Sequence, residues 1–295
     1  MKLVTFRSQG RDAVGALVDD GKNIVDLTAA GLAVDMLDLI ENFAGRKAGI
    51  AALVASRAGV QAADGVSILA PILAPHRNIF CVGKNYHEHA AEFGGSGFDS
   101  GSIGGAEVPD YPIIFSKPPS SVIGPGEAVV SANDPYDSVD YEAELAVIIG
   151  RKGRVSDAND PMSFVFGYTI LNDVTSRELQ KRHKQWLLGK GIDTFAPMGP
   201  AIVTAEALGD ISGLGIRTLV NGELRQSARI GDLIFDVPTL IRTIGRSITL
   251  LPGDIIATGT PAGVGIGFKP PRYLKAGDRV RVEVDSIGVL ENPVT

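Results

Sequence analysis

Short apolar runs separated by glycine, proline, asparagine and aspartate recur along this chain of 295 residues. Runs of this kind predict β-strands bounded by turns. We expect a hairpin turn at Asp20–Gly21 and a helix over 34–58, where apolar side chains recur at helical spacing. Shorter helices are expected after Asn85, after Thr175 and over 237–244.

The part of the chain after residue 78 has few segments that could serve as crossover helices between strands. Their scarcity argues against a doubly wound parallel sheet and favours a mixed β-sandwich or roll. We therefore predict an α+β, mostly β protein with a boundary near Pro71 and Pro75. The two predicted units are a small N-terminal α+β domain over 1–72 and a larger domain over 73–295.

One predicted strand, VDYEAELAVIIG, carries two acidic residues inside an apolar run. Glu142 and Glu144 are two residues apart, so their side chains point to the same face of a strand. The opposite face would present Tyr141, Ala143, Leu145 and Val147. Two like charges are costly to desolvate, and a divalent cation would offset that cost because Mg²⁺, Mn²⁺ and Ca²⁺ bind carboxylate oxygens. The alternative is an edge strand with both carboxylates in water.

A third acidic residue favours the metal site over the edge strand. Asp173 ends the apolar run FVFGYTILNDVT and is followed by Thr175-Ser176-Arg177-Glu178, which matches a helix capping box. Because Thr175 or Ser176 can cap that helix, Asp173 is free for another role. Three carboxylates from two neighbouring strands would form an open, oxygen-rich metal site.

The segment NYHEHAAE predicts a helix that carries a candidate general base. Asn85 is the expected N-cap, with Glu88 at the position that completes a capping box. His89 and Glu92 are three residues apart and share a helix face. A carboxylate beside an imidazole raises its basicity, as proton abstraction from water requires. An exposed histidine–glutamate pair without a catalytic role is the alternative.

Five more polar side chains are candidates for contact with a substrate. Lys190 lies between two glycines, and Lys117 follows a predicted strand and can reach a site or solvent. Arg177 and Gln180 share one face of the helix that follows the third acid. Thr260 belongs to TGTPAGVG, which lacks the ending of a phosphate-binding P-loop but offers hydroxyls and amides to a carboxylate.

Composition narrows the range of partners. The formal net charge is −6 and no run of five basic residues occurs, which argues against nucleic acid and anionic membranes as partners. The single cysteine, Cys81, excludes an intrachain disulfide. No apolar stretch reaches the length of a membrane span, and the first residues lack the apolar core of a signal peptide. We expect a cytoplasmic protein.

In their order and spacing, several segments resemble the fumarylacetoacetate hydrolase superfamily over residues 78–294, particularly members of the acylpyruvate hydrolase and 2-hydroxyhepta-2,4-diene-1,7-dioate isomerase type. The matching segments are CVGKNYHEHAAE, PIIFSKPPSSVIG, DYEAELAVIIG, GYTILNDVTSRELQ, GKGIDTFAPMGP, LVNGELRQ, LLPGDIIATGTPAGVG and LKAGDRVRVEVDSIGVLENPV. The resemblance implies a catalytic mixed β-sandwich roll after a small N-terminal domain, and a homodimer.

The resemblance also assigns roles to residues. The cofactor it implies is a divalent metal, Mg²⁺ foremost, with Mn²⁺ or Ca²⁺ as alternatives. Carried over by motif, the metal ligands are Glu142, Glu144 and Asp173, the catalytic residues are His89, Glu92 and Lys190, and Thr260 contacts a substrate carboxylate. The Gly/Ser-rich stretch over 94–105 is longer than in many members of that family, and is expected to be either a lid or a surface insertion.

The activity implied is metal-dependent hydrolysis of a C–C bond in a small 2,4-dioxo acid of the acylpyruvate or fumarylpyruvate type, as in aromatic catabolism. The reaction would pass through an enolate stabilised by the metal. The same chemistry serves oxaloacetate decarboxylation and the isomerisation of unsaturated oxo diacids. Ureidoglycolate lyase activity and a non-catalytic metal-dependent binding protein are further alternatives.

Overall fold

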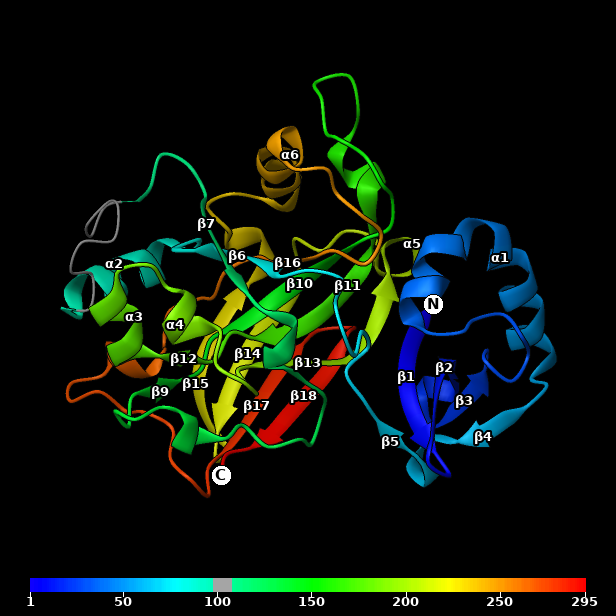
Figure 1. Ribbon diagram of the computed structural model, residues 1–295, viewed down its shortest axis with the longest axis horizontal. Coiled ribbons are helices and arrows are strands. Elements are labelled where there is room, and N and C mark those ends of the chain that lie inside the picture. The colour runs from blue at the N-terminus through cyan, green and yellow to red at the C-terminus, as the bar shows by residue number, and fades with distance from the viewer. Residues whose placement is uncertain (98–107) are drawn as a thin grey trace.

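The computed structural model describes residues 1–97 and 108–295, and a mixed twelve-stranded sheet is its largest element (Figure 1). Neighbouring strands are antiparallel except in the pairs β16–β6 and β8–β13. The main path of the sheet runs through β4 (Val60–Ala62), β3 (Asn23–Asp26), β2 (Arg11–Val18), β1 (Lys2–Ser8), β13 (Ala196–Thr204), β11 (Val165–Asn172), β10 (Ala143–Ile149), β16 (Ile255–Ala257), β6 (Ile79–Gly83) and β7 (Ile113–Lys117). Two short strands join at its side, β5 (Ser67–Ile68) on β1 and β8 (Val122–Ile123) on β13.

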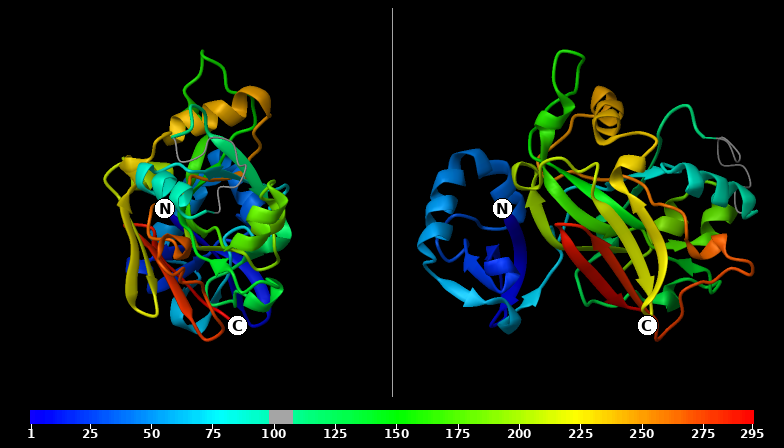
Figure 2. Two further views of the ribbon diagram at one scale, coloured as in Figure 1. Left: turned by 90° about the vertical axis from the view of Figure 1, so that its left-hand side faces the viewer. Right: turned by 180° about the vertical axis from the view of Figure 1, so that it is seen from behind.

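A smaller antiparallel sheet packs against the middle of the large one, and its strands run from yellow to red in Figures 1 and 2. In spatial order it contains β15 (Glu223–Arg229), β14 (Gly215–Val220), β17 (Arg279–Val284) and β18 (Gly288–Pro293). A separate pair joins β9 (Val139–Asp140) to β12 (Thr175–Ser176). The predicted mostly β, mixed architecture is confirmed.

Strand β10 lies at the centre of this arrangement and separates two apolar cores. Its residues Ala143, Leu145 and Val147 belong to the core between the two sheets, as does Tyr141 just before it. Ala146 and Ile148 belong to the core on the opposite face, together with residues of α1 (Met36–Ser56). The predicted alternation is confirmed. The edge-strand alternative is wrong, because β10 is paired on both sides and every residue in it is buried.

The expected helices are found among the described residues. Besides α1, they are α2 (His87–Gly95), α3 (Arg177–His183) and α6 (Val237–Ser247), and two further short helices are α4 (Leu187–Lys190) and α5 (Ala205–Leu208). Ser176 caps α3, since its hydroxyl accepts a hydrogen bond from the amide of Leu179. The hairpin at Asp20–Gly21 joins β2 to β3 as predicted.

Asn85 is not the N-cap of α2, and that expectation was wrong. The capping position is occupied by Tyr86, whose side chain makes no capping hydrogen bond. The amide group of Asn85 instead donates to the carbonyl oxygens of Phe235 (3.0 Å) and Thr258 (2.7 Å) and accepts from the amide of Phe235 (2.8 Å). A buried side-chain amide with three backbone partners fixes the segment that leads into α2.

The N-terminal region joins the rest of the protein through the large sheet. Lys2 and Leu3 of β1 pair with Val203 and Ile202 of β13, so the sheet continues from one region into the other (Figure 1). The division into domains at residues 72 and 73 stays a prediction. The Gly/Ser-rich stretch over 94–105 lies mostly outside the described residues. None of the helices in the described ranges has both the length and the apolar character needed to cross a membrane.

Candidate functional site

Three carboxylates meet where β10 begins and β11 ends. Glu142 directly precedes β10, Glu144 lies within it, and Asp173 directly follows β11. The pairing of β10 with β11, continued by a 2.8 Å hydrogen bond from the amide of Asp173 to the carbonyl of Glu142, places these side chains together. One oxygen of each lies within 4.8 Å of the others, and their residues are only 5%, 1% and 0% exposed.

Two buried lysines contact this triad of Glu142, Glu144 and Asp173. Lys190 Nζ lies 2.7 Å from an oxygen of Glu142 and 2.8 Å from an oxygen of Asp173. Lys117 Nζ donates to the second oxygen of Asp173 at 2.7 Å and to backbone carbonyls, including that of Lys190. Within the described ranges, the one hydrogen bond recorded to the carboxylate of Glu144 comes from the amide of Gly259 (2.8 Å), with no ion pair.

The two glutamates therefore differ in their electrostatics. Burial opposes ionisation of Glu142, but the charges of Lys190 and Arg177 outweigh it and lower its pKa to about 2. Burial and the negative charges of Asp173 and Glu142 raise the pKa of Glu144 well above its usual range. Three converging carboxylates, one of them without a cationic partner in the described structure, form a donor set suited to a divalent cation.

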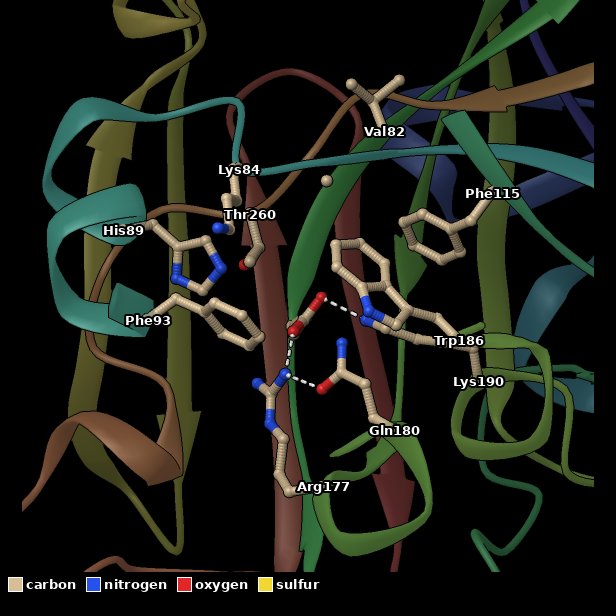
Figure 3. Close-up of a pocket in the computed structure, with 12 residues that line it drawn as sticks. Val82, Lys84, His89, Phe93, Phe115, Arg177, Gln180, Trp186, Lys190 and Thr260 are labelled. Atoms are coloured by element: carbon tan, nitrogen blue, oxygen red, sulfur yellow. Dashed lines mark hydrogen bonds and ion pairs between the residues drawn. The ribbon is translucent and has the colours of Figure 1, made fainter. Parts of the chain in front are cut away.

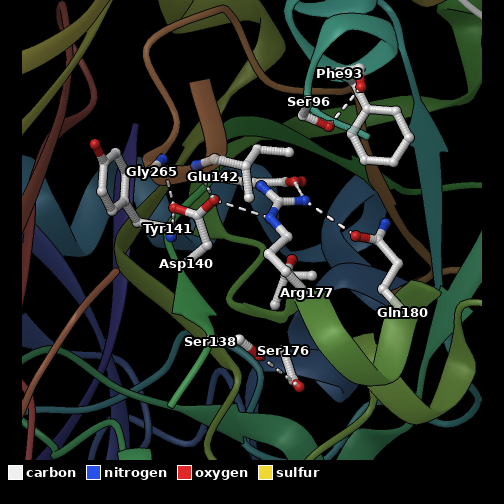
Figure 4. A network of polar contacts seen from close by, with 12 residues as sticks. Phe93, Ser96, Ser138, Asp140, Tyr141, Glu142, Ser176, Arg177, Gln180 and Gly265 are labelled. Carbon is white, nitrogen blue, oxygen red and sulfur yellow. Dashed lines mark hydrogen bonds and ion pairs between the residues drawn. The ribbon is translucent and has the colours of Figure 1, made fainter. Parts of the chain in front are cut away.

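Arg177 is held against the triad by Asp140, a residue that the sequence did not single out (Figure 4). Arg177 Nε donates to Asp140 at 2.8 Å, and a terminal nitrogen lies 2.7 Å from Glu142 and donates to the side-chain oxygen Oε1 of Gln180 at 3.2 Å. The second terminal nitrogen, Nη2, is buried and has no hydrogen-bond partner in the described part of the chain. That donor is available to a bound acceptor.

A small pocket, lined in part by Glu142, opens beside the triad (Figure 3). Lys84 and six residues predicted from the sequence form its polar lining, the six being His89, Glu142, Arg177, Gln180, Lys190 and Thr260. Its apolar wall consists of Phe93, Phe115 and Trp186, whose rings contact one another with centroids 6.2 Å apart between Phe93 and Trp186 and 5.1 Å between Phe115 and Trp186. The pocket thus offers several cationic or donor groups to a small anion.

Apart from Glu144 and Asp173 of the triad, two predicted residues, Glu92 and Lys117, do not line this pocket. Glu92 stands behind His89, with its carboxylate 3.3 Å from His89 Nδ1. The side chains of the pair are 5% and 16% exposed, so the alternative of an exposed pair is wrong. Lys117 is fully buried, and its ammonium group contacts Asp173 of the triad but does not line the pocket.

Other residues of the site were missed. Lys84 lines the pocket in a left-handed backbone conformation (φ 54°), and its ammonium lies 5.2 Å from the centre of the Phe93 ring. The side-chain amide of Gln226 donates to the hydroxyl of Thr260 at 2.8 Å and so fixes its orientation. Lys84 lies within the segment CVGKNYHEHAAE and Trp186 shortly before GKGIDTFAPMGP, but neither residue has a spacing that predicts the direction of its side chain.

Comparisons with known proteins agree on one family. A model described as fumarylacetoacetate (FAA) hydrolase C-terminal matches residues 78–295. The oxaloacetate tautomerase YisK of Bacillus subtilis (strain 168) is 47% identical over 229 residues, which make up 78% of this chain and 73% of that protein. The mitochondrial oxaloacetate tautomerase fahd2 of Xenopus laevis is 40% identical over 300 residues, which cover 100% of this chain and 90% of that protein.

A solved structure also matches over the whole chain. Maleylpyruvate hydrolase from Sphingobium sp. SYK-6, crystallised with manganese(II) ion and pyruvate, is 33% identical to this chain with a TM-score of 0.79. The match covers 100% of this chain and 99% of that one. Relatives that carry out different reactions therefore share this fold.

Proposed function

Because the chain belongs to the fumarylacetoacetate hydrolase family, we propose that it is an enzyme that interconverts the keto and enol forms of oxaloacetate. Two similar relatives are oxaloacetate tautomerases, which supports oxaloacetate, an alternative substrate in the sequence analysis, ahead of an acylpyruvate. The observation that carries the proposal is the buried carboxylate triad beside a small pocket with one imidazole and several cationic groups. This combination suits a compact oxo acid with two negative charges.

Glu142, Glu144 and Asp173 would hold the divalent metal. Mg²⁺ is the ion we propose, with Mn²⁺ supported by the manganese(II) in the related maleylpyruvate hydrolase and Ca²⁺ as a further alternative. When bound, the cation supplies positive charge that favours the enolate of a 2-oxo acid. Lys117 and Lys190 keep the triad in place, since each donates to a different oxygen of Asp173.

The pocket residues bind the substrate, stabilise its negative charge and transfer the proton. Arg177, whose Nη2 has no partner among the described residues, binds the substrate carboxylates together with Gln180 and Thr260. Lys190 stabilises negative charge on the C2 oxygen. His89, oriented by Glu92, takes a proton from C3 to leave the enolate and then delivers that same proton to the C2 oxygen, and in the reverse direction it carries the proton from the oxygen back to C3.

An assay of products tests the proposal. Enol-oxaloacetate absorbs in the ultraviolet because its C=C bond is conjugated with the carboxylate, so the enzyme should speed the decay of that absorbance. Pyruvate and carbon dioxide should form no faster with the enzyme than without it. If the enol decays no faster with metal-loaded protein than with buffer and metal alone, tautomerase activity is excluded.

A variant separates the role of His89 from that of the metal site. His89→Ala should slow enol decay by about 10²–10⁴-fold, the usual contribution of a general base, while metal content stays unchanged. The metal content, measured on the same preparation, is the control. Unchanged turnover would remove the imidazole from the mechanism.

Hydrolysis of a 2,4-dioxo acid is the second candidate, and the buried His89–Glu92 pair favours it because this pair could also activate water. In that reaction the water oxygen bonds to C4, the C3–C4 bond breaks, and C3 receives a proton. The related maleylpyruvate hydrolase supports this candidate. Release of two acids from fumarylpyruvate or an acylpyruvate would establish it, and release of pyruvate with carbon dioxide from oxaloacetate would indicate a decarboxylase.

We also propose that the protein acts as a homodimer. Tyr111, Leu187 and Leu188 are 81%, 48% and 53% exposed, and they lie beside the outer strand β7 or on α4, which contacts it. Light scattering should give twice the chain mass. Leu188→Glu should weaken the dimer while Leu224→Glu, a change at an equally exposed leucine on β15, should not.

A further inference from the structure

The carboxylate of Glu92 has a second set of contacts besides the one with His89. Its two oxygens accept hydrogen bonds from the amide of Gly263 at 3.0 and 3.2 Å. The same carboxylate lies 3.3 Å from His89 Nδ1. Glu92 therefore bridges α2 to the loop that runs from Gly263 to Gly267, and this bridge determines where the imidazole stands.

Gly267 provides the space in which that carboxylate lies. A Cβ atom added at Gly267 would be 1.8 Å from Oε1 of Glu92, 2.4 Å from Cδ and 2.7 Å from Cγ. Real side chains do not approach so closely, and Gly267 does not have the positive φ that would itself require glycine. Any side chain at this position must displace Glu92 or the loop.

The loop is held firmly, so displacement should fall on Glu92. Asp140 accepts hydrogen bonds from the amides of Gly265 (2.6 Å) and Ile266 (3.1 Å) on the other side of the loop. Apolar contacts add to this, because Phe93 of α2 packs with Val264 and Ile266 in one buried cluster.

We propose that Gly267 is a positioning residue for the His89–Glu92 pair: its missing side chain leaves room for the Glu92 carboxylate, which in turn holds the imidazole at the pocket. The effect on turnover rests on the proposed function, whereas the effect on the contact between Glu92 and Gly267 does not. Gly267 belongs neither to the lining of the pocket nor to the carboxylate triad.

The kinetic experiment compares two glycine-to-alanine variants. Gly267→Ala should lower kcat by about 100-fold, the order of loss that a 1 Å misplacement can cause, while KM and metal content change little. Gly95→Ala is the matched control, because it adds the same methyl group on α2 where no atom of a described residue lies within 4 Å. A wild-type kcat for Gly267→Ala, or an equal loss in both variants, would overturn the proposal.

A double-mutant cycle on thermal stability tests the contact without any assay of activity. Gly267→Ala should lower the melting temperature of the wild-type protein by at least about 2 °C, as a loss of 1 kcal/mol would in a domain of this size. In a Glu92→Ala background, where the carboxylate is gone, the same change should be close to neutral. Equal shifts in both backgrounds would show that Gly267 does not make room for Glu92, whatever the enzyme's reaction.

Discussion

Two buried carboxylates on the same stretch of chain, Asp140 and Glu144, have opposite surroundings. Asp140 accepts from Arg177 Nε at 2.8 Å and from the amides of Gly265 and Ile266. Glu144 accepts a single recorded hydrogen bond, from Gly259, among the residues that the structure describes. Both are at least 99% buried, so burial alone does not distinguish them.

The pKa values show the same contrast. Burial raises the pKa of both groups, but for Asp140 the charge of Arg177 opposes the rise. For Glu144 the neighbouring charges of Asp173 and Glu142 add to it. A buried carboxylate with a full set of donors holds the structure in place, whereas one left among other acids is poised to bind a cation.

The largest effect on activity should come from removing the charge of Glu144, the carboxylate with no ion pair among the described residues. Glu144→Gln should lower activity by more than about 100-fold, because even residues that only support metal ligands contribute 10–100-fold to affinity or activity. The metal-free protein should keep its stability, since the glutamine oxygen can still accept from Gly259 and the repulsion within the triad is reduced. Tautomerase rate, bound metal and a thermal melt are the measurements. Unchanged metal content would show that the triad is not the metal site.

The opposite result is expected for the partnered carboxylate. Asp140→Asn removes the charge that Arg177 faces and should destabilise the metal-free protein by about 3 kcal/mol, the lower end of the range for breaking a buried ion pair. The lower end applies because Glu142 still pairs with Arg177. Urea unfolding in the presence of a chelator measures the change. A loss below 1 kcal/mol would mean that Asp140 is not the structural member of the two.

Adding metal should stabilise only proteins that retain the triad. At a free Mg²⁺ concentration of 100 times its Kd, the gain should be about 2.7 kcal/mol for the wild type. Asp140→Asn should show a similar gain, and Glu144→Gln none. Melting curves with and without a chelator provide the comparison. Equal stabilisation of Glu144→Gln would place the ion elsewhere.

The smallest effect on stability should come from replacing a solvent-exposed carboxylate. Asp19 forms an exposed pair with Arg57, and hydrogen bonds from Arg57 and Asn23 lower its pKa from 3.8 to about 2. A folded-state pKa below the unfolded one means that this contribution is present above about pH 4 and is lost as the pH falls towards 2. Asp19→Asn should therefore differ slightly from the wild type at neutral pH and converge with it on acidification. Urea midpoints between pH 2 and 6 test this, and a difference that grows in acid would contradict it.

The glutamate pair shows what the sequence could predict. Alternation along VDYEAELAVIIG assigns side chains to the two faces of a strand without knowledge of its neighbours, and the structure confirms that assignment. That Asp173 would meet Glu142 depended on the register of two strands. We expected the three acids to meet because they lie on two strands predicted to be neighbours. The pairing of Ala143 on β10 with Asn172 on β11 brings Glu142 and Asp173 together.

Contacts between distant segments could not be predicted in this way. Asn85 resembled a cap, yet its partners are Phe235 and Thr258, far along the chain. The need for glycine at position 267 comes from a side chain on another element. Such requirements depend on tertiary packing, which local propensity and periodicity do not report.

The pairing of β1 with β13 affects how the chain can be divided. A protein shortened to residues 73–295 would lose the partner of Ile202 and Val203 and leave their amides and carbonyls open along a bare strand. Bare strands recruit other chains, so the shortened protein should precipitate or form fibrils even if every residue of its pocket were intact. We therefore expect the first strand to keep the rest of the chain from aggregating, although it contributes no side chain to the triad or the pocket.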